Sequence, residues 1–84
     1  MRAETPTDRL KWVARYFGCS QKIFAAEIGV GEGCLSNWMQ AAAGPSLRGA
    51  LLVHKRYGVS PDFLFLGLTG NLPKKVREAW ERRP

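Results

Sequence analysis

The residues best suited to hydrogen-bond chemistry in this chain stand close together between positions 32 and 37. Glu32 can accept hydrogen bonds, Ser36 can donate or accept, and the planar amide of Asn37 can do both at once. Gly33 stands among them without a side chain, so a ligand could approach the backbone closely there. These residue types suit recognition of a polar surface by hydrogen bonds.

The reactive residues do not form a pattern typical of an enzyme or a metalloprotein. The sequence contains no apparent nucleophile–base pair, carboxylate pair or phosphate-binding loop. Cys19 and Cys34 do not have metal-binding spacing, and His54 is the single histidine. We therefore expect no catalytic activity, no metal, no cofactor and no small-molecule substrate.

Two short helices joined by a tight turn are predicted to hold the polar residues. Apolar residues recur at helical spacing in 21–28 and again in 32–40. Gly29 stands where the first helix must end and the chain must reverse, which suits a residue that tolerates positive φ. A helix pair joined by such a turn with a central glycine is the helix-turn-helix pattern.

More helices are expected on both sides of this pair. One should run from about residue 7 to 17, and another should begin at the cap Ser46. The helix that begins after Ser46 is expected to bury an apolar stripe made of Leu47, Ala50, Leu51, His54 and Tyr57. In this prediction His54 is a packed histidine rather than a ligand. A fifth helix should begin at residues 60–62, and Phe63, Leu64 and Leu66 should close the core.

The chain is expected to end in a short basic helix at about 71–83. Leu72, Val76 and Trp80 form its apolar stripe. Because so short a helix is unstable alone, it must dock on the domain, dock on a partner subunit or stay partly frayed. With 84 residues, the chain is predicted to be a single all-α domain.

Three segments in register resemble the Cro and phage-repressor (CI-type, XRE-like) family. Residues 20–40 follow the family pattern S-Q-x-x-L-A-x-x-x-G-V-S-x-x-x-I-S-x-W-E, residues 45–47 resemble the start of its fourth helix, and residues 58–67 resemble its fifth. The resemblance spans Arg9 to Gly67. It implies a five-helix lambda-repressor-like domain with its core at about 7–67, followed here by the extra C-terminal helix.

This resemblance implies a sequence-specific regulator of transcription that binds double-stranded DNA. A phage- or prophage-like repressor of this kind would act as a homodimer and place the helix at about 32–40 in the major groove. The implied base contacts are Glu32, Gly33, Ser36 and Asn37. The candidate phosphate contacts are Gln21, Lys22, Gln40, Ser46 and Arg48. The candidate dimer-interface residues are Phe65 and Trp80.

Several of these assignments have a structural alternative. Glu32 could complement the helix dipole, Ser36 could face helix packing, and Gln21 could simply open its helix. Phe65 and Trp80 could equally complete the core of one subunit. Asn37 is the residue best explained by a base contact, because helix propensity gives no reason for an exposed asparagine.

The charge pattern departs from the family and leaves a second function open. The net charge is +6, which favours a polyanionic partner, but residues 20–40 carry one lysine against two glutamates and the loop at 40–44 is uncharged. Phosphate attraction supplies most non-specific affinity, so dimerisation or the basic ends would have to compensate. The alternative is a repressor-fold protein-interaction module, antirepressor-like or antitoxin-like, that binds DNA weakly or without specificity.

The expected location is the cytoplasm of a bacterium, with the gene bacterial or phage-encoded. The sequence has no long apolar run that would predict a membrane span. Its first residues are polar and lack the apolar stretch of a signal peptide.

Overall fold

The chain folds into helices, as the sequence predicts. The computed structural model describes residues 4–40 and 44–83, and within these ranges it contains six helices and no strand. The helices are α1 (Pro6–Tyr16), α2 (Gln21–Ile28), α3 (Glu32–Gln40), α4 (Leu47–Tyr57), α5 (Pro61–Leu66) and α6 (Lys74–Arg82). The all-α prediction is therefore confirmed. The uncharged loop noted in the sequence falls largely on residues 41–43, which lie outside the described ranges.

Local sequence determines where most of these helices begin. The hydroxyl of Ser20 accepts a hydrogen bond from the Ile23 N–H, and Ser46 and Ser60 cap α4 and α5 in the same way. At the start of α1 the Thr5 hydroxyl accepts a hydrogen bond from the Asp8 N–H, and the Asp8 carboxylate accepts one from the Thr5 N–H. Each cap satisfies an N–H group that has no partner inside its helix, so the helix starts follow from nearby residues alone.

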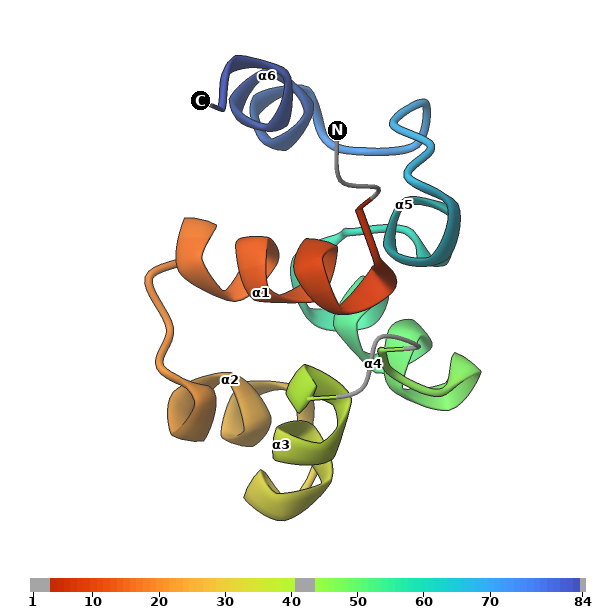
Figure 1. The fold of residues 1–84 in the computed structure, drawn as a ribbon. Coiled ribbons are helices and arrows are strands. Elements are labelled where there is room, and N and C mark those ends of the chain that lie inside the picture. Colours follow the sequence, from red (N-terminus) through yellow and green to blue (C-terminus); the bar gives the residue numbers. More distant parts are fainter. Residues whose placement is uncertain (1–3, 41–43, 84) are drawn as a thin grey trace.

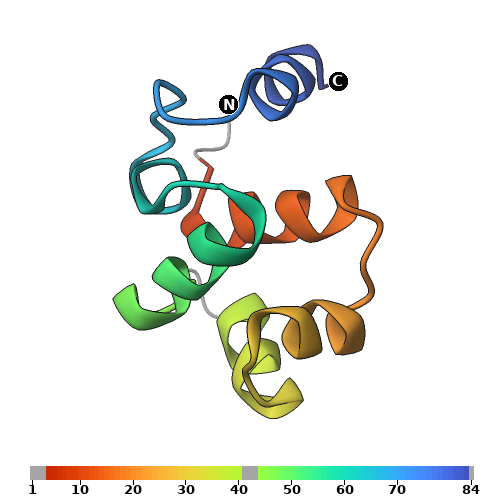
Figure 2. The same cartoon turned by 180° about the vertical axis from the view of Figure 1, so that it is seen from behind.

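The helices lie in three tiers. In Figure 1, α6 lies at the top, α1 in the middle, and α2 with α3 at the bottom. The first helix packs against α3 and α5, and α4 packs against both α2 and α5. Seen from behind, α4 lies between α5 and the α2–α3 pair (Figure 2). The largest fully buried side chains in this core are Leu10, Val13, Phe24, Leu35, Val53, Val59, Phe63 and Leu64.

The basic C-terminal helix docks on the domain, which is one of the three outcomes open from the sequence. Trp80 is only 8% exposed and meets the rings of Trp12 and Phe63 edge-to-face, with centroids 5.1 and 4.9 Å away. Val76 is also buried. The guanidinium of Arg83 forms an ion pair with Glu4, which links the two ends of the described chain.

The expected apolar stripe of α4 is confirmed at Ala50, which is buried, and at Tyr57, which is half-buried against the core, but it is wrong at its other three residues. Leu47 and Leu51 are 64% and 51% exposed and His54 is exposed, whereas the helix buries Gly49, Ala50 and Val53. The ring of Trp38 lies directly over Gly49, and the glycine side of α4 faces the core, where the helix packs on α2 and α5. A histidine packed in the core is therefore not part of this fold.

The expected role of Leu66 in the core is also wrong, because this side chain is 68% exposed. Phe63 and Leu64 are fully buried, as expected. The helix α5 has only six residues and ends at Gly67, where φ is +76°. So short a helix directs one face inward, and Leu66 lies outside that face.

Candidate nucleic-acid interface

A three-residue connection holds α2 and α3 in contact. Gly29 has φ +81°, and its N–H donates to the carbonyl of Ala25 at 2.9 Å. The Val30 N–H donates to the same carbonyl at 3.0 Å, so the free carbonyl at the end of α2 is satisfied twice. The next helix starts at Glu32, and the two helices pack against each other. The turn and the helix bounds expected at 21–28 and 32–40 are confirmed.

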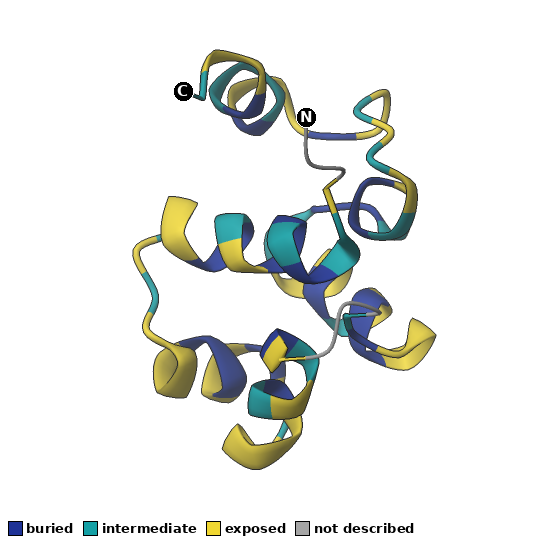
Figure 3. Cartoon of the chain, in the orientation of Figure 1, coloured by how far each residue is buried: buried dark blue, intermediate teal, exposed yellow. Residues whose placement is uncertain are grey.

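The outer face of α3 carries the four residues implied as base contacts. Leu35 and Met39 are the buried residues of this helix, while Glu32, Gly33 and Asn37 are exposed. Figure 3 shows the first turn of α3, at the lower end of the molecule, coloured as exposed. A side chain at Gly33 would meet no atom within 4 Å, so the backbone there is open to a ligand.

Ser36, the fourth implied base contact, is hydrogen-bonded within α3. Ser36 is half-buried, and its hydroxyl accepts a hydrogen bond from Gln40 Nε2 at 3.1 Å. This contact holds Ser36 and Gln40 together as one polar unit on α3. Gln40 is exposed, so its amide oxygen is accessible to a ligand.

One flank of α3 contains two cations that sequence analysis did not assign. Gln21 opens α2 and lines a cavity of about 300 Å³ together with Lys11 and Arg15 of α1 and Met39 of α3. Among the described residues, no ion pair within 4 Å involves Lys11 or Arg15. The spacing of these two residues, four apart on the polar face of a helix, was visible in the sequence. Their position beside Gln21 required the packing of α1 on α3.

The opposite flank of α3 contains the other candidate phosphate contacts. Ser46 and Arg48 line a cavity of about 200 Å³ with Cys34 and Trp38. The Ser46 hydroxyl accepts the Gly49 N–H at 3.2 Å, so it caps α4 as well as facing this cavity. Lys22 is exposed on α2. Polar and basic groups therefore lie on both sides of α3.

The two candidate dimer residues both contribute to the packing of their own chain. The packing of Trp80 on Trp12 and Phe63 occupies most of its ring. Phe65 is half-buried against the core, and its carbonyl accepts a hydrogen bond from Arg9 Nη2 at 2.9 Å. A dimer surface at these residues stays a prediction.

Two side chains with shifted pKa values, Arg9 and Tyr57, lie outside the α3 face and stabilise the fold. Burial lowers the pKa of Arg9, whose Nε donates to the Leu64 carbonyl at 2.9 Å. Burial, followed by a hydrogen bond with Cys19, raises the pKa of Tyr57 to about 12. The Tyr57 ring stacks on Phe24, with centroids 5.3 Å apart. Both residues hold helices together rather than line the candidate interface.

Comparison with protein-family models, curated proteins and solved structures finds no match to this chain. Within the described residues, no helix is long and apolar enough to cross a membrane. The same part of the chain contains no cluster of three or more histidine, cysteine or carboxylate side chains that could hold a metal ion.

Proposed function

We propose that this chain is a sequence-specific double-stranded DNA-binding regulator of transcription, a repressor of the Cro and phage-repressor type. In this proposal α2 and α3 form the helix-turn-helix, and α3 enters the major groove. The observation that carries it is the arrangement around α3, where an exposed polar face lies between two flanks that contain polar and basic groups.

The exposed face of α3 has the chemistry needed to read base edges. The major groove presents a distinct pattern of donors and acceptors for each base pair, and it is wide enough for one helix. Asn37 can bind adenine through two hydrogen bonds, and Glu32 can accept one from the amino group of cytosine. Gly33 lets the helix approach closely, which supports insertion of this end of α3 first.

The two flanks have the chemistry needed to contact phosphates on either side of the groove. On one side, Gln21, the first residue of α2, lines the same cavity as Lys11 and Arg15, and the first N–H groups of a helix are suited to bind a phosphate. On the other side, Arg48 and Ser46 lie at the start of α4. Such contacts position a protein on DNA, and base contacts then specify the sequence.

The proposed regulator acts as a homodimer on a palindromic site. Proteins with this motif bind half-sites about one helical turn, roughly 34–36 Å, apart. Doubling the contacts would compensate for the single lysine in residues 20–40. Phe65, which is half-buried, remains the candidate dimer contact with the more accessible side chain.

The second candidate is a protein-interaction module with weak or no specific DNA binding. The observation in its favour is the absence of any cation on α3, where Glu32 is the only charged residue. A carboxylate near phosphates weakens non-specific attraction, which supplies most of the affinity for DNA.

Selection from a pool of random duplexes, followed by sequencing, separates the two candidates. A regulator yields a palindromic motif, and the Asn37→Ala variant loses preference at a defined position in each half-site. Glu32→Ala, measured in parallel, tests a second position of the same face. Failure to recover any motif at low salt and high protein concentration would refute the regulator and favour the interaction module.

A further inference from the structure

A third cavity lies along α1 and reaches α6. It has a volume of about 390 Å³ and is lined by Glu4, Asp8, Lys11, Trp12, Arg15, Trp80 and Arg83. We refer to it as the α1–α6 groove. Its lining residues come mainly from α1 and from the region of α6, which form the middle and upper tiers in Figure 1, whereas the first turn of α3 lies at the lower end of the molecule. A ligand in this groove would leave the outer face of α3 free.

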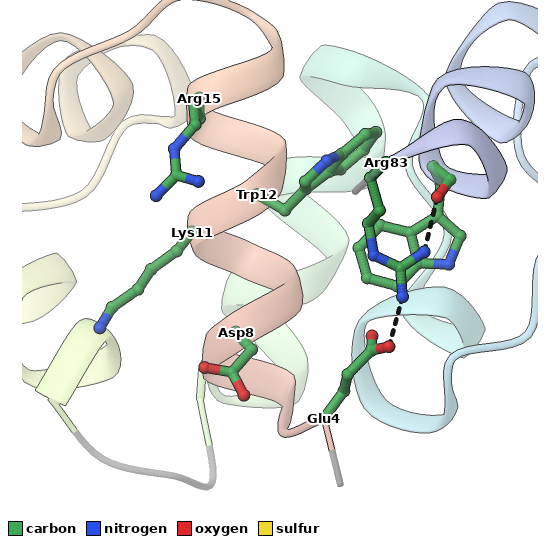
Figure 4. Close-up of a pocket in the computed structure, with 7 residues that line it drawn as sticks. Glu4, Asp8, Lys11, Trp12, Arg15 and Arg83 are labelled. Atoms are coloured by element: carbon green, nitrogen blue, oxygen red, sulfur yellow. Dashed lines mark hydrogen bonds and ion pairs between the residues drawn. The ribbon is translucent and has the colours of Figure 1, made fainter. Parts of the chain in front are cut away.

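The groove has an aromatic edge and a cationic edge. In Figure 4, Trp12 extends from α1 toward α6, whereas Lys11 and Arg15 extend from the other side of the helix. Trp12 is half-buried and stacks on Tyr16, which is 38% exposed, with ring centroids 5.2 Å apart. The guanidinium of Arg83 lies 3.3 Å from the centroid of the Trp80 ring.

The groove has a net positive charge, because three cations, Lys11, Arg15 and Arg83, line it together with two carboxylates, Glu4 and Asp8. Glu4 forms an ion pair with Arg83, and Asp8 accepts a hydrogen bond from the Thr5 N–H. No ion pair within 4 Å compensates Lys11 or Arg15 in the part of the chain that the structure describes. Charge complementarity therefore favours an anionic ligand. The partly exposed rings of Trp12 and Tyr16 favour a ligand that also carries an aromatic group.

We propose that the α1–α6 groove docks an acidic segment of a partner protein, whose carboxylates meet Lys11 and Arg15 and whose aromatic side chain rests against Trp12. A peptide fits this open groove better than a small molecule does, because small-molecule sites enclose most of the ligand surface. A nucleic-acid strand fits less well, because it carries a charge at every phosphate, whereas a peptide can place uncharged residues beside Glu4 and Asp8 at one end of the groove. This proposal does not rest on DNA binding. Because Lys11 and Arg15 also line the cavity beside Gln21, an acidic segment bound to them would compete with the phosphate contacts proposed there.

The test uses the acidic aromatic peptide EEFEEFEE and NMR of the isotope-labelled chain. The three tryptophans give three indole N–H signals, and Trp12 and Trp80 line the groove. The third, Trp38, packs over Gly49 and serves as an internal reference. We expect saturable shifts of the Trp12 and Trp80 signals and none of comparable size at Trp38. The peptide EESEESEE, with the same charge and no ring, should bind more weakly.

Variants of the cations complete the test. Lys11→Gln combined with Arg15→Gln should weaken binding of EEFEEFEE about tenfold, since each such ion pair contributes a factor of a few. Both side chains are exposed, so the fold is retained. Lys55→Gln is the matched control, because Lys55 is exposed on α4 and lines a different cavity with Glu27 and Arg56. It should bind the peptide as the parent chain does.

Three results would overturn the proposal. One is the absence of saturable shifts up to about 1 mM peptide, the range of the weakest specific binding. Another is an equal loss of affinity in the Lys55→Gln control. The third is tighter binding of single-stranded oligothymidylate than of EEFEEFEE at Trp12, which would assign the groove to nucleic acid. Each result is independent of duplex selection, because the readout is at Trp12 and Trp80.

Discussion

The ring of Trp38 occupies the space that a side chain at position 49 would need. A Cβ built on Gly49 would lie 2.4 Å from Cη2 of Trp38 and 2.7 Å from Cζ2. This contact places the ring of Trp38, from α3, against the buried side of α4, where Ala50 and Val53 also lie. The glycine is therefore required by packing, although it lies inside a helix where glycine is otherwise unfavourable.

We predict that Gly49→Ala lowers the free energy of unfolding by about 1–3 kcal/mol, because the added methyl group overpacks the contact with Trp38. Urea denaturation followed by circular dichroism measures the change. Gly33→Ala is the matched control. A Cβ at Gly33 meets nothing within 4 Å, so this variant should gain stability, up to about 1 kcal/mol, through helix propensity. Equal effects of the two substitutions would contradict the assigned role of Trp38.

Docking of α6 is predicted to depend mainly on Trp80. Trp80→Ala removes the edge-to-face contacts with Trp12 and Phe63 and leaves a cavity beneath the helix. The expected loss is about 3–5 kcal/mol, which is a large part of the stability of a small domain. Chemical denaturation measures it, with Leu68→Ala as a control because Leu68 is 55% exposed. A loss below about 1 kcal/mol for Trp80→Ala would show that α6 contributes little to the fold.

Helix boundaries could be predicted from the sequence because their causes are local. Ser20 and Gly29 lie next to the ends that they define, and the bounds of α2 follow from them. The buried face of α4 could not be predicted in this way. Its leucines form a regular apolar stripe, yet the helix buries the side that contains Gly49, and the contact of Gly49 with Trp38 joins residues of two different helices.

The candidate interface, too, could be predicted only where its features depend on a single helix. The polar face of α3 was predictable, because burial of Leu35 at helical spacing leaves Asn37 exposed. The cations beside Gln21 were not, because Lys11 and Arg15 lie on another helix. A helix presents its polar face to solvent in any fold, and only tertiary packing determines which neighbour that face borders.

Stability is predicted to fall as pH rises from about 10 to 12. The pKa of Tyr57 is raised to about 12 in the folded chain, chiefly by burial, whereas an unfolded tyrosine has a pKa near 10. Between these values the unfolded state has lost the proton and the folded state still holds it, so unfolding is increasingly favoured as pH rises. Tyr57→Phe should reduce the loss between pH 9 and pH 11.5, measured as the urea midpoint. An unchanged loss in this variant would assign the alkaline sensitivity to other groups.

The cations around Gln21 are predicted to set part of the salt dependence of DNA binding. Each phosphate contact contributes about −0.9 to the slope of log affinity against log salt. Lys11→Ala and Arg15→Ala should therefore each reduce the slope by about 1 while leaving the selected sequence motif unchanged. Fluorescence anisotropy with the selected duplex at several salt concentrations measures the slopes. Lys55→Ala, which removes a charge from a separate cavity on α4, should leave the slope as it is. Equal reductions in all three variants would mean that general charge, rather than the cavity beside Gln21, attracts the phosphates.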